Sequence, residues 1–161
     1  MEKVSSYNPN CKYDVFLSFR GEDTRRSFTD HLYYALNKKK IKAFRDDKEL
    51  KRGKPIRPEL LQAIEESKIS IIILSQNYAF STWCLDELTK IVQCMDSWGH
   101  MVIPIFYDVD PSVVRKQIGN FNEAFARHED TFKENVGKVQ TWRRALTKVA
   151  NLCGWDAKNR L

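Results

Sequence analysis

The residues with the clearest potential for chemistry in this sequence are a tryptophan and a glutamate four positions apart, Trp83 and Glu87. Side chains at this spacing lie on the same face of a helix, one turn above the other. The apolar side chains of the same segment form a stripe roughly 100–140° away from that face, so we predict that neither residue points at the core. An aromatic ring beside a carboxylate, both outside the core, indicates a ligand site.

The same stretch also has a purely structural explanation. Ser81 or Thr82 can cap the helix, and Asp86 and Glu87 can complement the positive charge of its N-terminal end. This explanation accounts for the acids but not for the tryptophan, so the stretch by itself leaves both interpretations open.

A second group of candidate residues surrounds positions 20–23, where we predict a loop between a strand and a helix. Arg20, Arg25 and Arg26 lie in or beside this loop. Backbone amides at the entry to a helix, with arginines nearby, suit a ligand that carries phosphate groups. An Arg-Gly loop is a weak motif alone, and its meaning depends on what the fold places beside it.

Metal and disulfide chemistry are not indicated by the sequence. His31, His100 and His128 are far apart and lack the spacing of metal ligands. The cysteines are scattered without CxxC spacing, which is typical of reduced thiols. They are Cys11, Cys84, Cys94 and Cys153. We therefore expect no metal site and no bound cofactor.

Length and composition indicate one globular domain. The chain has 161 residues, of which 42% are hydrophobic and 30% charged. No run approaches the ~18 apolar residues of a membrane span, and residues 1–10 lack the apolar stretch of a secretory signal. We expect no membrane association.

The net charge of +6 is concentrated at one end of the chain. Residues 138–161 hold six basic side chains and one acidic side chain, whereas the rest of the chain is close to balance. A nucleic-acid-binding protein would instead show a basic stripe with aromatic residues that stack on bases. We therefore do not expect a nucleic-acid partner.

Strands and helices are predicted to alternate along the chain. Apolar and β-branched runs predict strands at 13–19, 41–44, 69–74 and 101–107. The helical period predicts a first helix capped by Asp23 or Thr24, and further helices at about 58–67, 82–98, 113–117, 121–133 and 138–152. Gly154 suits the C′ position that closes the last helix. A short fifth strand is expected either near 115–120 or after the last helix. This alternation is typical of an open parallel α/β sheet.

Fold logic brings the two groups of candidate residues together. In a flavodoxin-like sheet with strand order 2-1-3-4-5, the chain reverses direction between strands 1 and 3, and ligands bind there at the carboxyl ends of the strands. The loops after these strands carry Arg20 and Gly21 on one side, and lead into Trp83 and Glu87 on the other. The long polar loop 45–57 can cover the crevice, since loops of that length are usually functional or mobile.

Three segments, in order, resemble signature motifs of the Toll/interleukin-1 receptor (TIR) domain, in the form found in plant intracellular immune receptors. They are 14–25 (DVFLSFRGEDTR), 83–88 (WCLDEL) and 104–112 (PIFYDVDPS). The similarity spans about residues 11–155. It implies a five-stranded parallel sheet with helices on both faces. It also implies an activity that splits NAD⁺ or NADP⁺, as the substrate, at the nicotinamide–ribose bond, in immune signalling that leads to defence and cell death.

The resemblance implies roles for individual residues. Glu87 matches the family's catalytic glutamate, and Trp83 matches the aromatic residue at the nicotinamide end of the substrate. The positions that match segments around the rest of the dinucleotide are Arg20, Gly21, Asp23, Thr24 and Arg25, together with the segment 46–57 that contains Gly53.

Self-association is a further implication of the resemblance. In the family, catalysis follows association with other TIR domains, and the loop that resembles 46–57 reaches a neighbouring protomer. The helix face around His31 and the last helix near Gly154 resemble two other self-contact surfaces. The family's Ser-His pair on the first helix is Asp30-His31 here, and the added carboxylate bears on that contact.

A single carboxylate is enough for the implied reaction. Ordinary glycosidases need two, because one of them protonates a poor leaving group. Nicotinamide in NAD⁺ carries a positive charge and departs neutral, so it needs no acid. An ionised Glu87 can hydrogen-bond the ribose hydroxyls and stabilise the oxocarbenium-like transition state. Trp83 can stack on the cationic ring, which is worth roughly 0.5–2 kcal/mol.

Two other functions occur on such a fold. A non-catalytic adaptor would use it only to recruit further copies, and the glutamate four residues after the tryptophan argues for catalysis instead. A phospho-acceptor receiver would need an aspartate at the end of strand 3 and paired acids after strand 1. The sequence has Leu74-Ser75 and Arg20 at these places, which excludes a receiver.

We expect three parts in the chain: a disordered leader over 1–10, a TIR domain over 11–155 and the start of a linker over 156–161. The resemblance implies that the domain belongs to a larger receptor with nucleotide-binding and leucine-rich-repeat parts. It places that receptor in the cytoplasm, with the nucleus as a second compartment.

Overall fold

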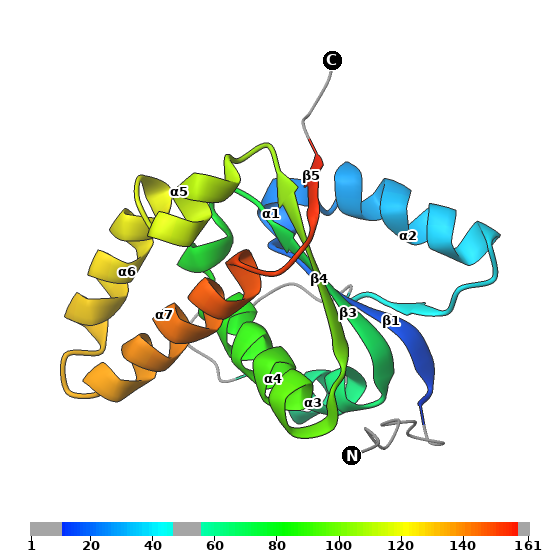
Figure 1. Cartoon of the computed structure of the whole chain (residues 1–161), viewed down its shortest axis with the longest axis horizontal. Coiled ribbons are helices and arrows are strands. Elements are labelled where there is room, and N and C mark those ends of the chain that lie inside the picture. The colour runs from blue at the N-terminus through cyan, green and yellow to red at the C-terminus, as the bar shows by residue number, and fades with distance from the viewer. Residues whose placement is uncertain (1–10, 47–55, 158–161) are drawn as a thin grey trace.

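The centre of the fold is a parallel sheet of five strands in the order β2-β1-β3-β4-β5 (Figure 1). The computed structural model describes residues 11–46 and 56–157. The strands are β1 (Tyr13–Ser18), β2 (Ala43–Phe44), β3 (Ser67–Leu74), β4 (Met101–Tyr107) and β5 (Trp155–Ala157). The predicted strand order is confirmed, and the short fifth strand follows the last helix.

Helices connect successive strands. They are α1 (Gly21–Thr24), α2 (Phe28–Lys38), α3 (Pro58–Glu65), α4 (Thr82–Trp98), α5 (Pro111–Lys116), α6 (Asn120–Thr131) and α7 (Val136–Ala150), with a 3₁₀ turn η1 (Tyr78–Phe80) before α4. Within the described ranges, no helix combines the length and the apolar character needed to cross a membrane.

Two hydrophobic cores lie on opposite faces of the sheet. Because side chains alternate along a strand, Phe16 and Ile72 belong to one core while Val15 and Ile71 belong to the other. The first core packs against α3, α4, α6 and α7, and the second packs against α2 (Figure 1). The predicted arrangement with helices on both faces is confirmed.

The chain makes an extra turn between β1 and α2 that the sequence analysis placed in a loop. Residues Gly21–Thr24 form α1, closed by a hydrogen bond from the Arg25 amide to the Gly21 carbonyl at 2.9 Å. The helix α2 then begins at Phe28, with Ser27 as its N-cap. The prediction that Asp23 or Thr24 caps the following helix is therefore wrong, because both residues lie inside this separate turn.

The helix α4 has the boundaries that its sequence predicts. The Ser81 hydroxyl accepts a hydrogen bond from the Cys84 amide at 3.2 Å, so Ser81 is the N-cap. At the other end Gly99 adopts a left-handed conformation with φ of 68°, which favours glycine. These two ends fix the start of α4 directly after the loop that leaves β3.

Between the last helix and the last strand, the chain at Gly154 lies very close to Pro104 of β4. The helix α7 ends with Asn151 as its C-cap, so Gly154 does not close it, contrary to the prediction. A Cβ atom on Gly154 would lie 2.2 Å from the carbonyl oxygen of Pro104. Glycine is needed here because the chain passes directly over β4 before it forms β5. The strand β5 includes residues 156 and 157, which the sequence analysis assigned to a linker.

Candidate functional site

Glu87 and Trp83 lie in the first turns of α4, and both side chains are buried. Each is only 7% exposed. The prediction that they lie outside the core is wrong, because a helical projection considers only the side chains of the helix itself. In the structure, the end of β1 and the turn η1 pack over this face of α4.

A row of hydroxyl groups leads to the Glu87 carboxyl group. The Ser18 hydroxyl, at the end of β1, lies 2.8 Å from Oε1 of Glu87 and donates to it when Glu87 is ionised. The same Ser18 oxygen lies 2.8 Å from the hydroxyl of Tyr78, which donates to the backbone carbonyl of Cys84 at 3.1 Å. Three elements, β1, η1 and α4, therefore meet at one carboxyl group.

The surroundings of Glu87 favour its neutral form. Burial is the main cause, and it raises the pKa of Glu87 from an ordinary 4.5 to about 8. The hydrogen bond from Ser18 lowers this pKa, as does the Arg57 guanidinium, while the carboxylates of Asp46 and Asp86 raise it. A carboxyl group that changes its charge near neutral pH is typical of functional sites.

Asp46 and Arg57 stand at the two ends of the segment between β2 and α3. Arg57 Nη2 donates to Asp46 Oδ1 at 2.7 Å, and Arg57 Nη1 donates to Glu59 at 3.1 Å. The buried Nε of Arg57 has no hydrogen-bond acceptor among the residues that the structure describes. The predicted site residue Gly53 lies outside the described residues. The ends of this segment nevertheless place both of their charges beside Glu87.

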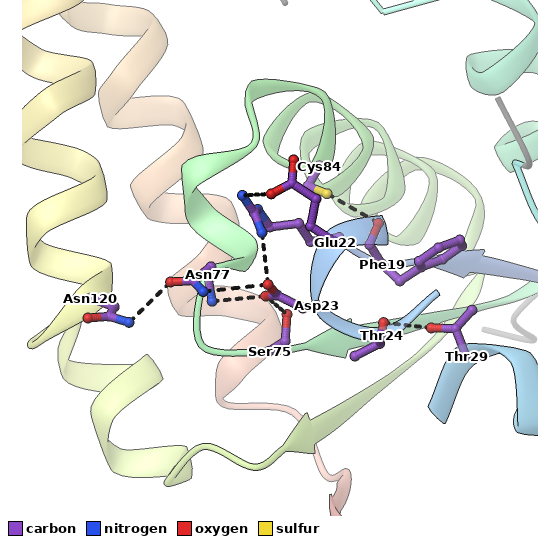
Figure 2. Close-up of polar contacts among 10 residues, drawn as sticks. Phe19, Glu22, Asp23, Thr24, Thr29, Ser75, Asn77, Cys84 and Asn120 are labelled. Atoms are coloured by element: carbon purple, nitrogen blue, oxygen red, sulfur yellow. Dashed lines mark hydrogen bonds and ion pairs between the residues drawn. The ribbon is translucent and has the colours of Figure 1, made fainter. Parts of the chain in front are cut away.

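Asp23 ties the loop after β1 to the loop after β3, as Figure 2 shows. Its Oδ2 atom accepts hydrogen bonds from the Ser75 hydroxyl at 2.5 Å and from the Asn77 amide at 3.1 Å. The side-chain oxygen of Asn77 accepts in turn from Asn120 of α6 at 3.1 Å. The predicted meeting of the two loops is confirmed, and the carboxylate of Asp23 is occupied by protein donors.

Arg20 and Thr24 are also engaged within the protein. Arg20 donates from Nη1 to Asp23 at 2.8 Å and from Nη2 to Glu22 at 3.0 Å. Thr24 is 1% exposed, and its hydroxyl oxygen lies 2.7 Å from that of Thr29 (Figure 2). The structure therefore does not bring Thr24 to the crevice, because the turn of α1 directs it inward, against α2.

Gly21 and Arg25 lie together beside the end of β1. The Arg25 guanidinium is 5.0 Å from the centre of the Phe19 ring, and its Nη1 atom donates to the Asp46 carbonyl at 2.6 Å. A Cβ atom on Gly21 would lie 2.9 Å from the Arg25 side chain. Glycine at position 21 thus lets this guanidinium lie against the backbone and reach the segment that carries Asp46.

The residues predicted for self-contact differ in their surroundings. Asp30 accepts a hydrogen bond from Arg45 Nη1 at 2.8 Å, and the Arg45 guanidinium lies 4.1 Å from the centre of the Tyr33 ring. His31 is exposed on α2. Gly154 has an internal role at β4, as described above. The added carboxylate of Asp30 is therefore paired within the chain.

A separate groove of about 580 Å³ lies on another side of α4, where it faces α3 and α7. Its lining includes Asp86, which accepts a hydrogen bond from the Trp142 indole at 3.1 Å, and Lys138. Neither Trp83 nor Glu87 lines it. We place the candidate site at Glu87 because the strand ends and the perturbed carboxyl group are there. In the described part of the chain, no three His, Cys, Asp or Glu side chains gather to hold a metal ion.

Sequence reasoning missed Ser18 and Tyr78. Ser18 occupies the position two residues after Phe16, so its hydroxyl shares the face of β1 that packs on α4. A hydroxyl in this register, at the carboxyl end of a central strand, was the available signal. Tyr78 carried no comparable signal, because a tyrosine in a loop is usually exposed, whereas this one is fully buried.

Comparison with known proteins decides the family. The TIR domain family matches residues 12–160, nearly the whole chain. The chain belongs to the TIR family. This TIR domain is 62% identical over 143 residues to the disease resistance protein RPV1 of Vitis rotundifolia, covering 89% of this chain and 10% of that protein. It is 55% identical over 150 residues to the TMV resistance protein N of Nicotiana glutinosa, covering 93% of this chain and 13% of that protein.

A solved structure shares the fold of this TIR domain. The TIR domains in the activated Roq1 resistosome, which directly recognizes the pathogen effector XopQ, superpose with a TM-score of 0.81 at 54% identity. The match covers 90% of this chain and 87% of that chain. The chain spans only about a tenth of the length of the curated relatives cited above.

Proposed function

We propose that this TIR domain hydrolyses NAD⁺ or NADP⁺ at the nicotinamide–ribose bond when copies of it associate, and that this activity signals plant defence and cell death. The observation that carries the proposal is the position of Glu87. Its buried carboxyl group lies at the reversal point between β1 and β3, held by Ser18 and one helical turn from Trp83. Ligands bind at this point in open α/β sheets.

The proposed reaction needs one charged carboxylate and one water molecule. The bond between the ribose C1′ and the nicotinamide nitrogen breaks, and its electron pair neutralises the ring nitrogen. Ionised Glu87 stabilises the positive charge that develops on the ribose. Water then adds to C1′ and loses a proton, so the products are ADP-ribose or its phosphate, nicotinamide and a proton. Trp83 positions the ring by stacking.

The perturbed pKa of Glu87 fits this substrate. With a pKa of about 8, the Glu87 carboxyl group is neutral in most molecules at pH 7 while the site is empty. A cationic nicotinamide ring nearby lowers that pKa, because an opposite charge favours the ionised form. The buried Nε of Arg57 is a further donor at the site that a phosphate or hydroxyl group of the dinucleotide can use.

Association is part of the proposal because the site is closed in a single copy. Trp83 and Glu87 are each 7% exposed, which leaves little room for a dinucleotide. The structurally similar Roq1 domains are part of an assembly. We propose that contacts between copies, including the face around His31, change the positions of Asp46 and Arg57 and open the crevice.

Nicotinamide release tests the proposal. The domain is assayed with NAD⁺ and with NADP⁺, dilute and then concentrated or crowded, beside Glu87→Ala. Glu123→Ala, which removes an exposed glutamate of α6 paired with Arg127, is the matched control. Release should rise more than linearly with protein concentration and disappear only in Glu87→Ala. Wild-type rates in Glu87→Ala would refute the role of Glu87. No release under any condition, with association still detectable, would favour the adaptor function.

The whole protein in which such a domain works is also a proposal. The relatives are disease resistance proteins about ten times longer than the matched region. We propose that this domain is the signalling part of a comparable plant receptor with nucleotide-binding and leucine-rich-repeat parts. We further propose that this receptor acts in the cytoplasm and the nucleus.

A further inference from the structure

Four polar groups form a row in space that ends at Glu87, and each lies within hydrogen-bonding distance of the next. Oε1 of Glu87 lies 2.8 Å from the Ser18 hydroxyl, which lies 2.8 Å from the Tyr78 hydroxyl, which lies 3.1 Å from the Cys84 carbonyl oxygen. Ser18 and Tyr78 are both fully buried, so bulk solvent does not reach their hydroxyl groups. The protons available to this row must therefore come from its own members.

The number of protons decides how many of the three contacts are hydrogen bonds. When Glu87 is ionised, Ser18 and Tyr78 supply two protons, so one of the three contacts is left without a donor. When Glu87 is neutral, its own O–H can donate to Ser18, Ser18 can donate to Tyr78, and Tyr78 can donate to Cys84. All three contacts are then satisfied. All three observed contacts can be hydrogen bonds only when Glu87 carries a proton.

We propose that Ser18 and Tyr78 form a hydroxyl relay that holds a proton on Glu87 while the site is empty and reverses its direction when a cationic ligand arrives. The first half of this proposal concerns the chain alone. The second half rests on the proposed function, since NAD⁺ or NADP⁺ supplies the cation. The relay would keep an isolated copy in the form that cannot stabilise a developing positive charge.

The reversal releases one proton and leaves two hydrogen bonds in place of three. Glu87 is 7% exposed, and its proton leaves to solvent. The Ser18 hydroxyl then turns to donate to the carboxylate, and the Tyr78 hydroxyl turns to donate to Ser18. The Cys84 carbonyl loses its donor from Tyr78. Charge-assisted hydrogen bonds are roughly twice as strong as neutral ones, so the new bond to the carboxylate compensates for the lost bond at Cys84.

The other ionisable groups around Glu87 influence its charge but do not supply protons to the row. Asp86, on the same helix, and Asp46, at the end of the segment after β2, favour the neutral form of Glu87, while Arg57 opposes them. Burial raises the pKa of Tyr78 well above its ordinary value, so its phenol keeps the proton that the relay needs. The Cys84 thiol also keeps its proton, because burial raises its pKa, and it donates to the Phe19 carbonyl at 3.4 Å (Figure 2).

Tyr78→Phe distinguishes the relay from a simple polar neighbour. If Tyr78 only solvated the carboxylate, its loss would raise the pKa of Glu87. In the relay, Tyr78 accepts from Ser18 in the protonated state, so its loss frees the Ser18 hydroxyl for the carboxylate. We therefore expect the pKa of Glu87 to fall by about one pH unit in Tyr78→Phe. In a Ser18→Ala background, where the row is cut, the same change at Tyr78 should shift nothing.

The measurement is a carbon-13 NMR titration of the Glu87 carboxyl group in the free domain, assigned by its absence in Glu87→Gln. Tyr107→Phe, a ring that packs against Phe28 on the other face of the sheet, is the control and should leave the titration unchanged. A rise in the pKa in Tyr78→Phe, or an equal shift with Ser18→Ala present, would overturn the relay. If these variants do not fold, the infrared band of a protonated carboxyl group at pH 7 in the wild type, absent in Glu87→Gln, tests it instead, and its absence from the wild type would overturn the relay.

These readings separate the relay from the proposed activity. The titration uses no substrate, so a relay without nicotinamide release would disprove the enzymatic proposal alone. Release in the wild type with an unchanged titration in Tyr78→Phe would disprove the relay alone. Addition of NAD⁺ to the wild type should release an initial burst of up to one proton per site as Glu87 ionises, larger at pH 7 than at pH 9, before each hydrolysis adds a proton of its own.

Discussion

Glu87 is placed where its charged form destabilises the fold. Its pKa is about 8 in the folded chain and near the ordinary 4.5 when unfolded. Between these values the folded state binds more protons than the unfolded state, so the free energy of unfolding falls as the pH rises. The stabilisation is fully present below about pH 4.5 and is lost as the pH rises through about 8.

Glu87→Gln should therefore stabilise the domain at high pH while it abolishes nicotinamide release. The amide keeps the size of the side chain, and its N–H can donate to Ser18 as the neutral acid does, but it cannot ionise. Relative to the wild type, we expect the variant to gain roughly 4–5 kcal/mol at pH 9 and less than ~1 kcal/mol at pH 5. Urea unfolding at both pH values measures the difference. An equal gain at both would show that charge is not the cause, and Glu123→Gln on the surface should show no gain.

The ionisation of Glu87 should also appear in the rate of NAD⁺ cleavage. We expect kcat/KM to rise with pH and to level off above about 8, because it reports the free enzyme. The profile of kcat should rise at lower pH, since the cationic substrate favours the carboxylate. Initial rates between pH 5.5 and 9.5, at limiting and saturating NAD⁺, provide both profiles. Identical profiles would argue against a direct interaction between the ring and Glu87.

At the level of elements, the loops after β1 and β3 depend on one carboxylate. Asp23 accepts from Ser75, from the Asn77 amide and from Arg20. Asp23→Ala should lower the free energy of unfolding by roughly 2–4 kcal/mol, since it leaves buried donors without an acceptor. Glu22→Ala removes the exposed partner of the same arginine and should cost less than ~1 kcal/mol. Denaturant unfolding compares the two, and similar losses would mean that Asp23 does not join the loops.

The position of β5 beside β4 depends on the absence of a side chain at residue 154. A methyl group there would lie 2.2 Å from the Pro104 carbonyl oxygen, so Gly154→Ala should displace β5 and lower the free energy of unfolding by ~2 kcal/mol or more. Gly137→Ala, in α7 and with its nearest contact at 4.0 Å, should be neutral or stabilising by up to ~1 kcal/mol. Thermal unfolding compares them. Normal stability with lost self-association in Gly154→Ala would instead support a surface role for Gly154.

The elements themselves were largely predictable, because their patterns are local. The continuous apolar run of β3 and the caps of α4 at Ser81 and Gly99 lie within a few residues of the structure they determine. The predicted strand order also places the loop of Arg20 beside the start of α4, which carries Glu87. Burial of Trp83 and Glu87 could not be predicted, since it depends on β1 and η1, which are distant in sequence. The inward turn of Thr24 was missed because four residues are too few for a periodic pattern.

At the level of the whole molecule, we expect a substitution on the exposed face of α2 to change self-association without changing stability. His31 is exposed, so His31→Ala should change the free energy of unfolding by less than ~0.5 kcal/mol. If the surrounding face is a contact between copies, the same change should weaken self-association and the concentration-dependent rise in nicotinamide release. Sedimentation velocity at several concentrations measures the first effect.

Asp30 offers a contrast to His31 on the same helix. Its carboxylate pairs with Arg45, so Asp30→Ser would release an arginine that is now held beside Tyr33. A change in association by Asp30→Ser but not by His31→Ala would place the contact at Arg45 instead of the histidine.

The buried acid at position 87 is under two opposed kinds of selection. Selection for stability favours an uncharged residue at this position, because the ionised carboxyl group lowers the free energy of unfolding, whereas selection for catalysis retains the acid. In a lineage whose TIR domain serves only as a scaffold, we expect the acid to be replaced early. Its persistence in a lineage would then be a record of continuing selection for catalysis, readable from the sequences alone.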